Sequence, residues 1–289
     1  MRPTRRQFLA GTVSTFSVLG TARLLSAAPA GSRSTVPKIG MCDWSLGQMN
    51  PSAMSLARQI GLDGVEVSVG TRENNMWLRR EEVQAEYLQA ARDQGMAIPS
   101  LALGELNHVP LMSEPRAALW VADAIEVARR MKVNKMLLAF FGKGELKGTN
   151  AEDMRRTIDV LAELAPRAEK AGVVLGVESY LSAEDHLRIL DAVKSKFVQV
   201  YYDVKNMADA GHDPVAALET LGRERICQIH FKDTPYLEDG SGKVDWPKTV
   251  AAIRKIGYEG WIVLETPSPS HDVVADTKKN LEYVRRLFA

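Results

Sequence analysis

The chain has 289 residues, of which 45% are hydrophobic and 25% are charged, and its formal net charge is +1 at pH 7. This composition is typical of a soluble globular protein that can bury a substantial core. A nearly neutral chain without a basic stripe around interleaved aromatic residues is not expected to bind nucleic acid. The cysteines lie in apolar runs, so Cys42 and Cys227 are expected to be buried hydrophobic side chains rather than a disulfide or a thiolate metal site.

The N-terminal segment has the features of an export signal. Two adjacent arginines, Arg5 and Arg6, precede a weakly apolar stretch over residues 8–25. Small residues at positions 28 and 30 follow with the spacing that signal peptidases accept. The pattern is similar to a twin-arginine (Tat) signal, which carries folded proteins across a bacterial inner membrane.

The expected organisation is a twin-arginine signal over 1–30, a linker over 31–36 and one folded domain over 37–289. This signal would bring the protein to the Tat translocation machinery and then to the periplasm or another exported location. An uncleaved signal would instead anchor the protein, because residues 8–25 are just long enough to span a bilayer. After cleavage no stable membrane span is expected.

Eight strand-like segments follow one another from residue 37 onward. Each is short, rich in valine, isoleucine or aromatic residues, and bounded by residues that favour turns. The expected strands cover residues 38–44, 64–69, 97–103, 135–141, 173–179, 198–204, 226–232 and 260–265.

Segments with helical spacing separate these strands. They carry apolar residues at intervals of three and four, and several begin at a capping residue or end at glycine. Strict alternation of strand and helix implies a parallel sheet, and eight such units fit a closed (β/α)8 barrel, the TIM barrel. The alternative is an open doubly wound sheet, which usually has a glycine-rich phosphate loop that residues 42–47 do not form. The expected helices cover residues 51–60, 82–94, 115–131, 151–171, 182–194, 214–221, 246–256 and 273–287.

The last four strand-like segments each end in a residue that can bind a metal. Catalytic groups of a (β/α)8 barrel lie at the carboxyl ends of the strands, and strand alternation directs these four side chains to the interior. Three carboxylates brought together repel one another unless a cation holds them. The donor set suits one Mn²⁺, Mg²⁺ or Co²⁺ ion, and Zn²⁺ less well. The predicted metal ligands are Glu178, Asp203, His230 and Glu265.

Short motifs at these strand ends resemble the xylose-isomerase-like barrels, the sugar isomerases and epimerases related to ketose 3-epimerases. The resemblance covers about residues 38–289. It implies that the four matching residues bind one divalent metal, and that Glu178 and Glu265 are also the catalytic acid–base pair. The motifs are Leu62-Asp63-Gly64-Val65-Glu66, Val177-Glu178, Tyr202-Asp203-Val204-Lys205-Asn206, His230-Phe231-Lys232-Asp233 and Gly260-Trp261-Ile262-Val263-Leu264-Glu265.

The implied activity is isomerisation or epimerisation of an unphosphorylated sugar or a related keto compound. A dication that binds a carbonyl and its neighbouring hydroxyl acidifies the C–H between them and stabilises the resulting enediolate. One carboxylate removes the proton and the other returns one. The same intermediate permits loss of water, so a metal-dependent lyase acting on a keto-sugar or inosose is an alternative, and a non-catalytic sugar-binding protein is a further one. A DNA-repair endonuclease of a related barrel would need more than the five histidines present.

Other polar residues near strand ends are expected to contact the substrate, itself a small carbohydrate. Glu66 shares its strand face with Ser68 and is expected to point inward, to the substrate or to a metal ligand. Asn206 stands where ketose 3-epimerases have a substrate-binding histidine, and Tyr236 where they have an arginine. The sequence leaves the sugar and the oligomeric state open, and a homo-oligomer is compatible with it. The predicted substrate-binding residues are Glu66, His108, Glu184, Asn206, Lys232 and Asp233.

Overall fold

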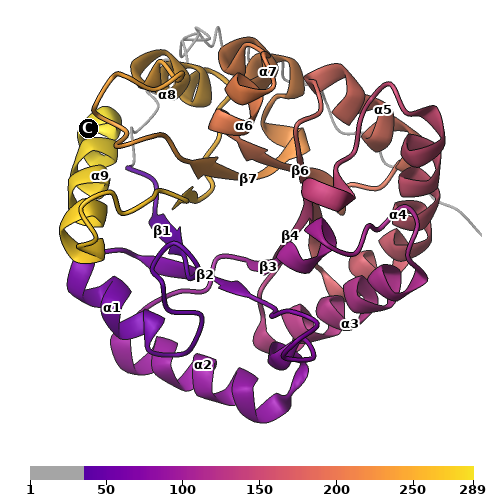
Figure 1. Ribbon diagram of the computed structural model, residues 1–289, viewed down its shortest axis with the longest axis horizontal. Helices are drawn as coiled ribbons and strands as arrows, with labels where there is room; N and C mark the ends of the chain where they lie inside the picture. Colours follow the sequence, from indigo (N-terminus) through magenta and orange to yellow (C-terminus); the bar gives the residue numbers. More distant parts are fainter. Residues whose placement is uncertain (1–35) are drawn as a thin grey trace, which may run out of the picture. The chain divides into compact units, whose positions relative to one another are not determined.

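The computed structural model describes residues 36–289, which form a closed parallel β-barrel surrounded by helices (Figure 1). The strands follow in chain order around the barrel, and the last pairs with the first. This is the expected (β/α)8 fold. The strands are β1 (Ile39–Cys42), β2 (Gly64–Ser68), β3 (Leu101–Leu103), β4 (Lys135–Phe140), β5 (Val174–Ser179), β6 (Val198–Asp203), β7 (Ile226–Phe231) and β8 (Ile262–Leu264).

The eight predicted helices form the outer ring, in which α9 lies beside α1 and closes the circle (Figure 1). Four short 3₁₀ helices occur in the loops: η1 (Trp77–Arg79), η2 (Gly104–Asn107), η3 (Gly142–Gly144) and η4 (Arg223–Arg225). The ring consists of α1 (Ala53–Ile60), α2 (Glu81–Gln94), α3 (Pro115–Met131), α4 (Ala151–Ala171), α5 (Ala183–Val193), α7 (Pro214–Leu221), α8 (Trp246–Lys255) and α9 (Val273–Phe288).

Local signals fix both ends of helix α4 where the sequence predicts them. Helix α4 begins after Asn150, whose side-chain oxygen accepts a hydrogen bond from the Asp153 N–H at 3.2 Å. It ends at Gly172, whose φ of 70° lies in the left-handed region that glycine adopts without strain.

Three features differ from the sequence-based expectation. Strand β3 is shorter than predicted, because Pro99 has no N–H for the ladder, and Ala97 forms only an isolated bridge to Gly64. A short helix, α6 (Val204–Asp209), follows β6 directly. Strand β8 ends at Leu264, but the N–H of the next residue still donates to the Phe231 carbonyl at 3.0 Å, so Glu265 keeps the strand alternation.

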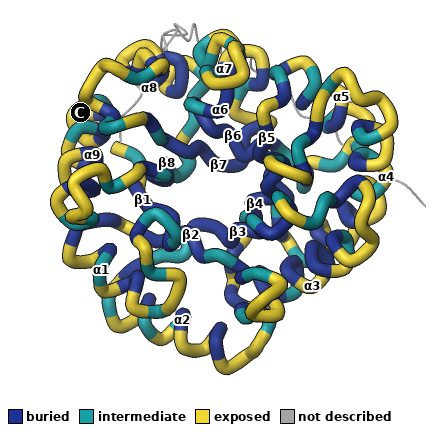
Figure 2. Tube along the Cα trace, viewed as in Figure 1, coloured by how far each residue is buried: buried dark blue, intermediate teal, exposed yellow. Residues whose placement is uncertain are grey.

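Apolar side chains fill two regions of the barrel. The larger region lies between the strands and the surrounding helices. The outer faces of the helices are exposed, whereas the strands are buried (Figure 2). A smaller cluster fills the barrel interior and includes Leu137, Tyr201 and Cys227. Burial of each large apolar side chain contributes roughly 1.5–3 kcal/mol to folding. Both cysteines are free and buried, as predicted.

The predicted signal over 1–30 and residues 31–35 of the predicted linker lie outside the described part of the chain. Within residues 36–289, no helix combines the length and the apolar character needed to cross a bilayer.

Candidate metal centre

The four predicted ligands converge at the carboxyl end of the barrel, where one donor atom from each lies within 4.8 Å of the others. His230 Nδ1 is 3.2 Å from Glu178 Oε1, 3.4 Å from Glu265 Oε2 and 3.9 Å from Asp203 Oδ2. Donors that share a small ion at about 2.1 Å are themselves roughly 3 Å apart. The spacing therefore resembles that of a ligand set around one ion.

The barrel brings these residues together because they end four successive strands. Asp203 of β6 lies opposite His230 of β7, so the two side chains point to the interior at the same level. The same aspartate begins α6, since its Oδ1 accepts the Asn206 N–H at 2.7 Å. Helix α6 thus holds one carboxylate oxygen and leaves the other facing the cluster.

The electrostatics of the cluster favour a bound cation. Burial raises the pKa of Asp203 to about 7 and also raises the pKa of Glu178, because the interior solvates a carboxylate poorly. Burial acts in the same direction on Glu265, but the His230 hydrogen bond and the Lys232 charge lower its pKa below the ordinary value. Asp203 Oδ2 is buried and accepts no hydrogen bond from the described residues. An oxygen-rich set with one imidazole, in which the Lys232 ammonium lies 3.2 Å from this Asp203 oxygen, fits a divalent metal ion.

His230 is held from below by Glu66. His230 Nε2 lies 2.9 Å from Glu66 Oε2, and the Tyr201 hydroxyl donates to the same oxygen. A carboxylate only accepts, so Nε2 donates to Glu66, and loss of the Nδ1 proton when a cation binds would leave the Nδ1 lone pair toward the other three ligands. Cys42 Sγ also lies 3.6 Å from Nε2, but burial raises the pKa of this thiol well above its usual range, so it remains a poor metal ligand.

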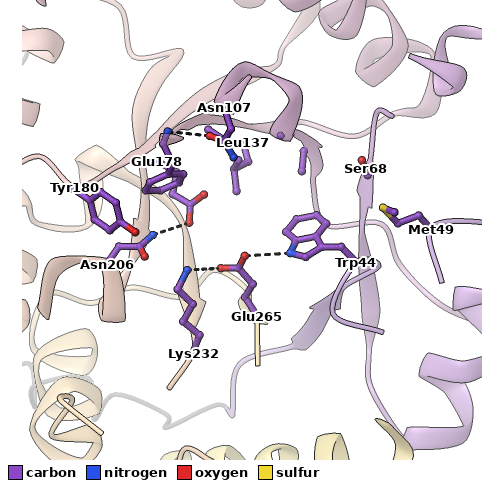
Figure 3. Close-up of a pocket in the computed structure, with 14 residues that line it drawn as sticks. Trp44, Met49, Ser68, Asn107, Leu137, Glu178, Tyr180, Asn206, Lys232 and Glu265 are labelled. Carbon is purple, nitrogen blue, oxygen red and sulfur yellow. Dashed lines mark hydrogen bonds and ion pairs between the residues drawn. The ribbon is translucent and has the colours of Figure 1, made fainter. Parts of the chain in front are cut away.

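A cavity of about 290 Å³ opens above the cluster and is lined by two of its members, Glu178 and Glu265 (Figure 3). Asn206 and Lys232, both predicted to bind substrate, also line it. Asn206 Nδ2 donates to Glu178 Oε1 at 3.3 Å, and Lys232 Nζ donates to Glu265 Oε2 at 2.9 Å. Trp44 Nε1 donates to the other oxygen of Glu265 at 3.1 Å. Each glutamate is therefore oriented by at least one neutral or cationic donor.

The other four predicted substrate-binding residues do not line this cavity, although Glu66 takes the alternative position expected for it, beside a predicted metal ligand. Glu66 lies beneath His230. His108 is exposed after β3, and Glu184 is exposed in the first turn of α5, where a negative charge suits the helix dipole. Asp233 is buried and accepts the Thr234 N–H at 2.9 Å. It does not reach the cavity, because the preceding residue, Lys232, points there and neighbouring side chains alternate in direction.

Several residues of the cavity were not predicted from the sequence. Asn107, next to His108, lines the cavity and accepts the Phe141 N–H at 2.9 Å. Tyr180 follows Ser179 at the end of β5, and Met49 lies in the loop after β1. The sequence signal that could have identified these residues was their position after strand ends. An aromatic or thioether side chain at such a position does not by itself indicate function.

A (β/α)8 barrel with carboxylates and a histidine clustered at the carboxyl ends of its strands defines a class of metal-binding barrels. The chain belongs to the xylose isomerase-like TIM barrel family, whose sequence model matches residues 54–287. This confirms the family expected from the motifs.

Known proteins similar to this chain include sugar epimerases, which are isomerases. The 2-epi-5-epi-valiolone 7-phosphate 2-epimerase of an Actinoplanes species is 25% identical over 225 residues, 75% of this chain and 82% of the relative. The D-psicose 3-epimerase of Enterocloster bolteae is 23% identical over 229 residues, 73% of this chain and 75% of the relative. A crystal structure of D-psicose 3-epimerase in the presence of D-fructose matches in fold, with a TM-score of 0.72 at 16% identity, and covers 87% of this chain and 99% of that one.

The contact between Glu66 and His230 predicts a change in metal affinity. Glu66→Gln keeps the shape of the side chain but removes the charge that makes the imidazole more basic, and changes of this kind typically cost about 10–100-fold in affinity. We expect Mn²⁺ affinity, measured by calorimetry, to fall by this factor while circular dichroism stays unchanged. The control is Glu86→Gln, an exposed glutamate of α2. Equal Mn²⁺ affinity in the two variants would contradict the assigned role.

The side chain of Asp43 predicts a pH dependence of stability. Its Oδ2 accepts the Ser68 N–H at 2.9 Å, and its buried Oδ1 accepts no hydrogen bond from the described residues. Burial, with the nearby Glu66 charge, raises the pKa of Asp43 from 3.8 to about 8. The folded protein therefore keeps a proton that the unfolded chain releases, and the associated stability is complete below pH 4 and lost as the pH rises toward 8.

Asp43→Asn removes the titrating carboxyl group. The amide N–H of asparagine takes the place of the O–H of the protonated carboxyl as a hydrogen-bond donor. Relative to the parent, the variant is expected to gain stability between pH 4 and 8, by up to about 1.4 kcal/mol per pH unit, and to gain nothing further above pH 8. Urea unfolding at pH 5, 7 and 9 measures the difference. Asp63→Asn, at an exposed aspartate, is the control. A stability difference that is constant with pH would refute the assigned protonation.

Proposed function

We propose that the protein is a divalent-metal-dependent sugar isomerase or epimerase that acts by removing and returning a proton next to a carbonyl. The observation that carries this proposal is the pair Glu178 and Glu265, which belong to the ligand cluster and also line the cavity. The similarity to sugar epimerases supports the same reaction class.

Glu178, Asp203, His230 and Glu265 would hold the ion, and the donor set favours Mn²⁺, Mg²⁺ or Co²⁺. The ion supplies Lewis acidity, which makes a C–H beside a carbonyl easier to deprotonate. The protein side chains then handle the protons.

The hydrogen bonds suggest how the two glutamates divide the proton transfers. Glu178 Oε1 faces His230 and Asn206, whereas no hydrogen bond or ion pair to a described residue engages its Oε2. Both oxygens of Glu265 accept hydrogen bonds, from Trp44 and Lys232. Glu178 is therefore the better placed group to remove the substrate proton, and Glu265 to return one. Asn206 and Lys232 orient these carboxylates and contact the substrate oxygens.

Removal of the Glu178 carboxylate tests this proposal. Glu178→Gln is expected to lower turnover at least 100-fold, because a general base contributes about 10²–10⁴ in rate, and to weaken Mn²⁺ binding. The measurement is metal-dependent deuterium uptake from D2O by a panel of keto-sugars and inososes, followed by mass spectrometry. Glu184→Gln, at an exposed glutamate six residues away, should retain full activity.

The outcomes of this experiment separate the enzyme classes. Deuterium uptake without loss of mass supports an isomerase or epimerase. A product that has lost water would instead indicate that the protein is a lyase. Ligand binding without any uptake in the presence of Mn²⁺ would instead indicate a non-catalytic sugar-binding protein. Normal turnover by the Glu178→Gln variant would remove Glu178 from the mechanism.

We also propose that the protein is exported through the twin-arginine route, on the basis of Arg5 and Arg6. Folding before export would let the metal be bound in the cytoplasm. Replacement of both arginines by lysine is expected to move the protein from the periplasmic to the cytoplasmic fraction in a bacterial host. Immunoblots of the fractions measure this change. Unchanged export of the double variant would refute the route.

A further inference from the structure

The charges and walls of the cavity narrow the class of substrate. We infer that the substrate is an uncharged carbohydrate that carries a ring or apolar substituent at its outer end, and that sugar phosphates are excluded. The reaction in this inference rests on the proposed function, but the binding preference can be measured without turnover.

The charges of the ligand cluster and Lys232 balance without any contribution from the substrate, and Glu66 beneath His230 adds a further carboxylate. Glu178, Asp203 and Glu265 carry three negative charges when ionised, and a divalent ion together with Lys232 supplies three positive ones. The Lys232 ammonium is committed to this balance, since Nζ lies 2.9 Å from Glu265 Oε2 and 3.2 Å from Asp203 Oδ2.

No second cation is present to receive a phosphate group. Among the described residues that line the cavity, Lys232 is the sole lysine or arginine. Lys143 in η3, two residues after Phe141, lies outside the lining. A phosphate ester would bring a charge of about −1.5 to −2 into a site that is already balanced, with no arginine or free lysine to bind it.

The mouth of the cavity is apolar on opposite sides. Met49 and Tyr180 are 52% and 39% exposed, and both belong to the four large hydrophobic side chains that are exposed in the described chain. Figure 3 shows Tyr180 across the cavity from Met49 and Trp44, with the glutamates between them. Phe141 packs edge-on against Tyr180, with ring centroids 4.9 Å apart, and so limits the movement of the Tyr180 ring.

A ligand that covers this mouth with an apolar surface would bind more tightly, because it removes exposed apolar side chains from water. Exposed aromatic and thioether groups bind ring faces and apolar substituents. The polar groups of this part of the lining are the Tyr180 hydroxyl, Ser68 and Asn107, and the Asn107 side-chain oxygen is already used by the Phe141 N–H. A small monosaccharide bound at the floor would leave the exposed Met49 and Tyr180 side chains in water, whereas an aglycone or second ring would cover them.

Calorimetry on the full Mn²⁺-loaded chain tests this binding preference. The probes are methyl 3-keto-β-D-glucoside, its phenyl counterpart, and the 6-phosphate of the methyl compound. These keep one carbonyl and its neighbouring hydroxyl constant. We expect the phenyl compound to bind about tenfold more tightly than the methyl compound, and the phosphate at least tenfold more weakly. Equal or weaker binding of the phenyl compound, or tighter binding of the phosphate, overturns the inference.

Variants at the mouth locate the preference. Tyr180→Ala should bring the phenyl-to-methyl affinity ratio close to one, while Leu119→Ala should leave it unchanged, since Leu119 is 66% exposed on α3 away from the cavity. Sedimentation of the parent and both variants is measured in parallel. A Tyr180→Ala variant that keeps the ratio but changes its oligomeric state would show that the mouth is an interface between copies, and would overturn the inference. Absence of deuterium exchange with every probe contradicts the proposed function, whereas the affinity ratios decide this inference.

Discussion

Mutual repulsion among the carboxylates of Glu178, Asp203 and Glu265 is the constraint on which the carboxyl end of the barrel depends. Burial removes the water that would otherwise solvate these charges, and the raised pKa of Asp203 reflects that cost. Lys232 meets part of the negative charge, and a divalent ion would complete the balance. The surrounding donors, including Trp44 and the N-terminus of α6, fix the carboxylates in the orientation that such an ion requires.

His230 connects this cluster to the packing of the barrel below it. Its Nδ1 faces the three carboxylates, while its Nε2 meets Glu66, which also accepts from Tyr201. Gln228 donates to the Tyr201 hydroxyl at 2.7 Å and continues the polar chain into the interior. A barrel centre is normally filled by branched apolar side chains. In this protein, the orientation of a predicted metal ligand therefore depends on residues well below the cavity.

In the proposed function, the residues that carry the chemistry are separate from those that select the substrate. The ligands lie at strand ends, where the sheet fixes their geometry, whereas Met49 and Asn107 lie in the following loops. Loops of (β/α)8 barrels can change without disturbing the sheet. This division is consistent with the names of the similar epimerases, one of which refers to a phosphorylated substrate and another to a free ketose.

Local spacing in the sequence determined the (β/α)8 fold and the phase of the four predicted metal ligands, because strand alternation and helical periodicity depend only on neighbouring residues. Only the tertiary structure decided how deep in the barrel the predicted substrate-binding side chains lie and which way they point. Glu66 supports His230 instead of lining the cavity, Glu184 faces solvent, and Tyr180 forms part of the mouth. The reason is physical: the level of each residue inside a barrel is set by the stagger between strands distant in sequence, and the path of each loop is set by the side chains it meets.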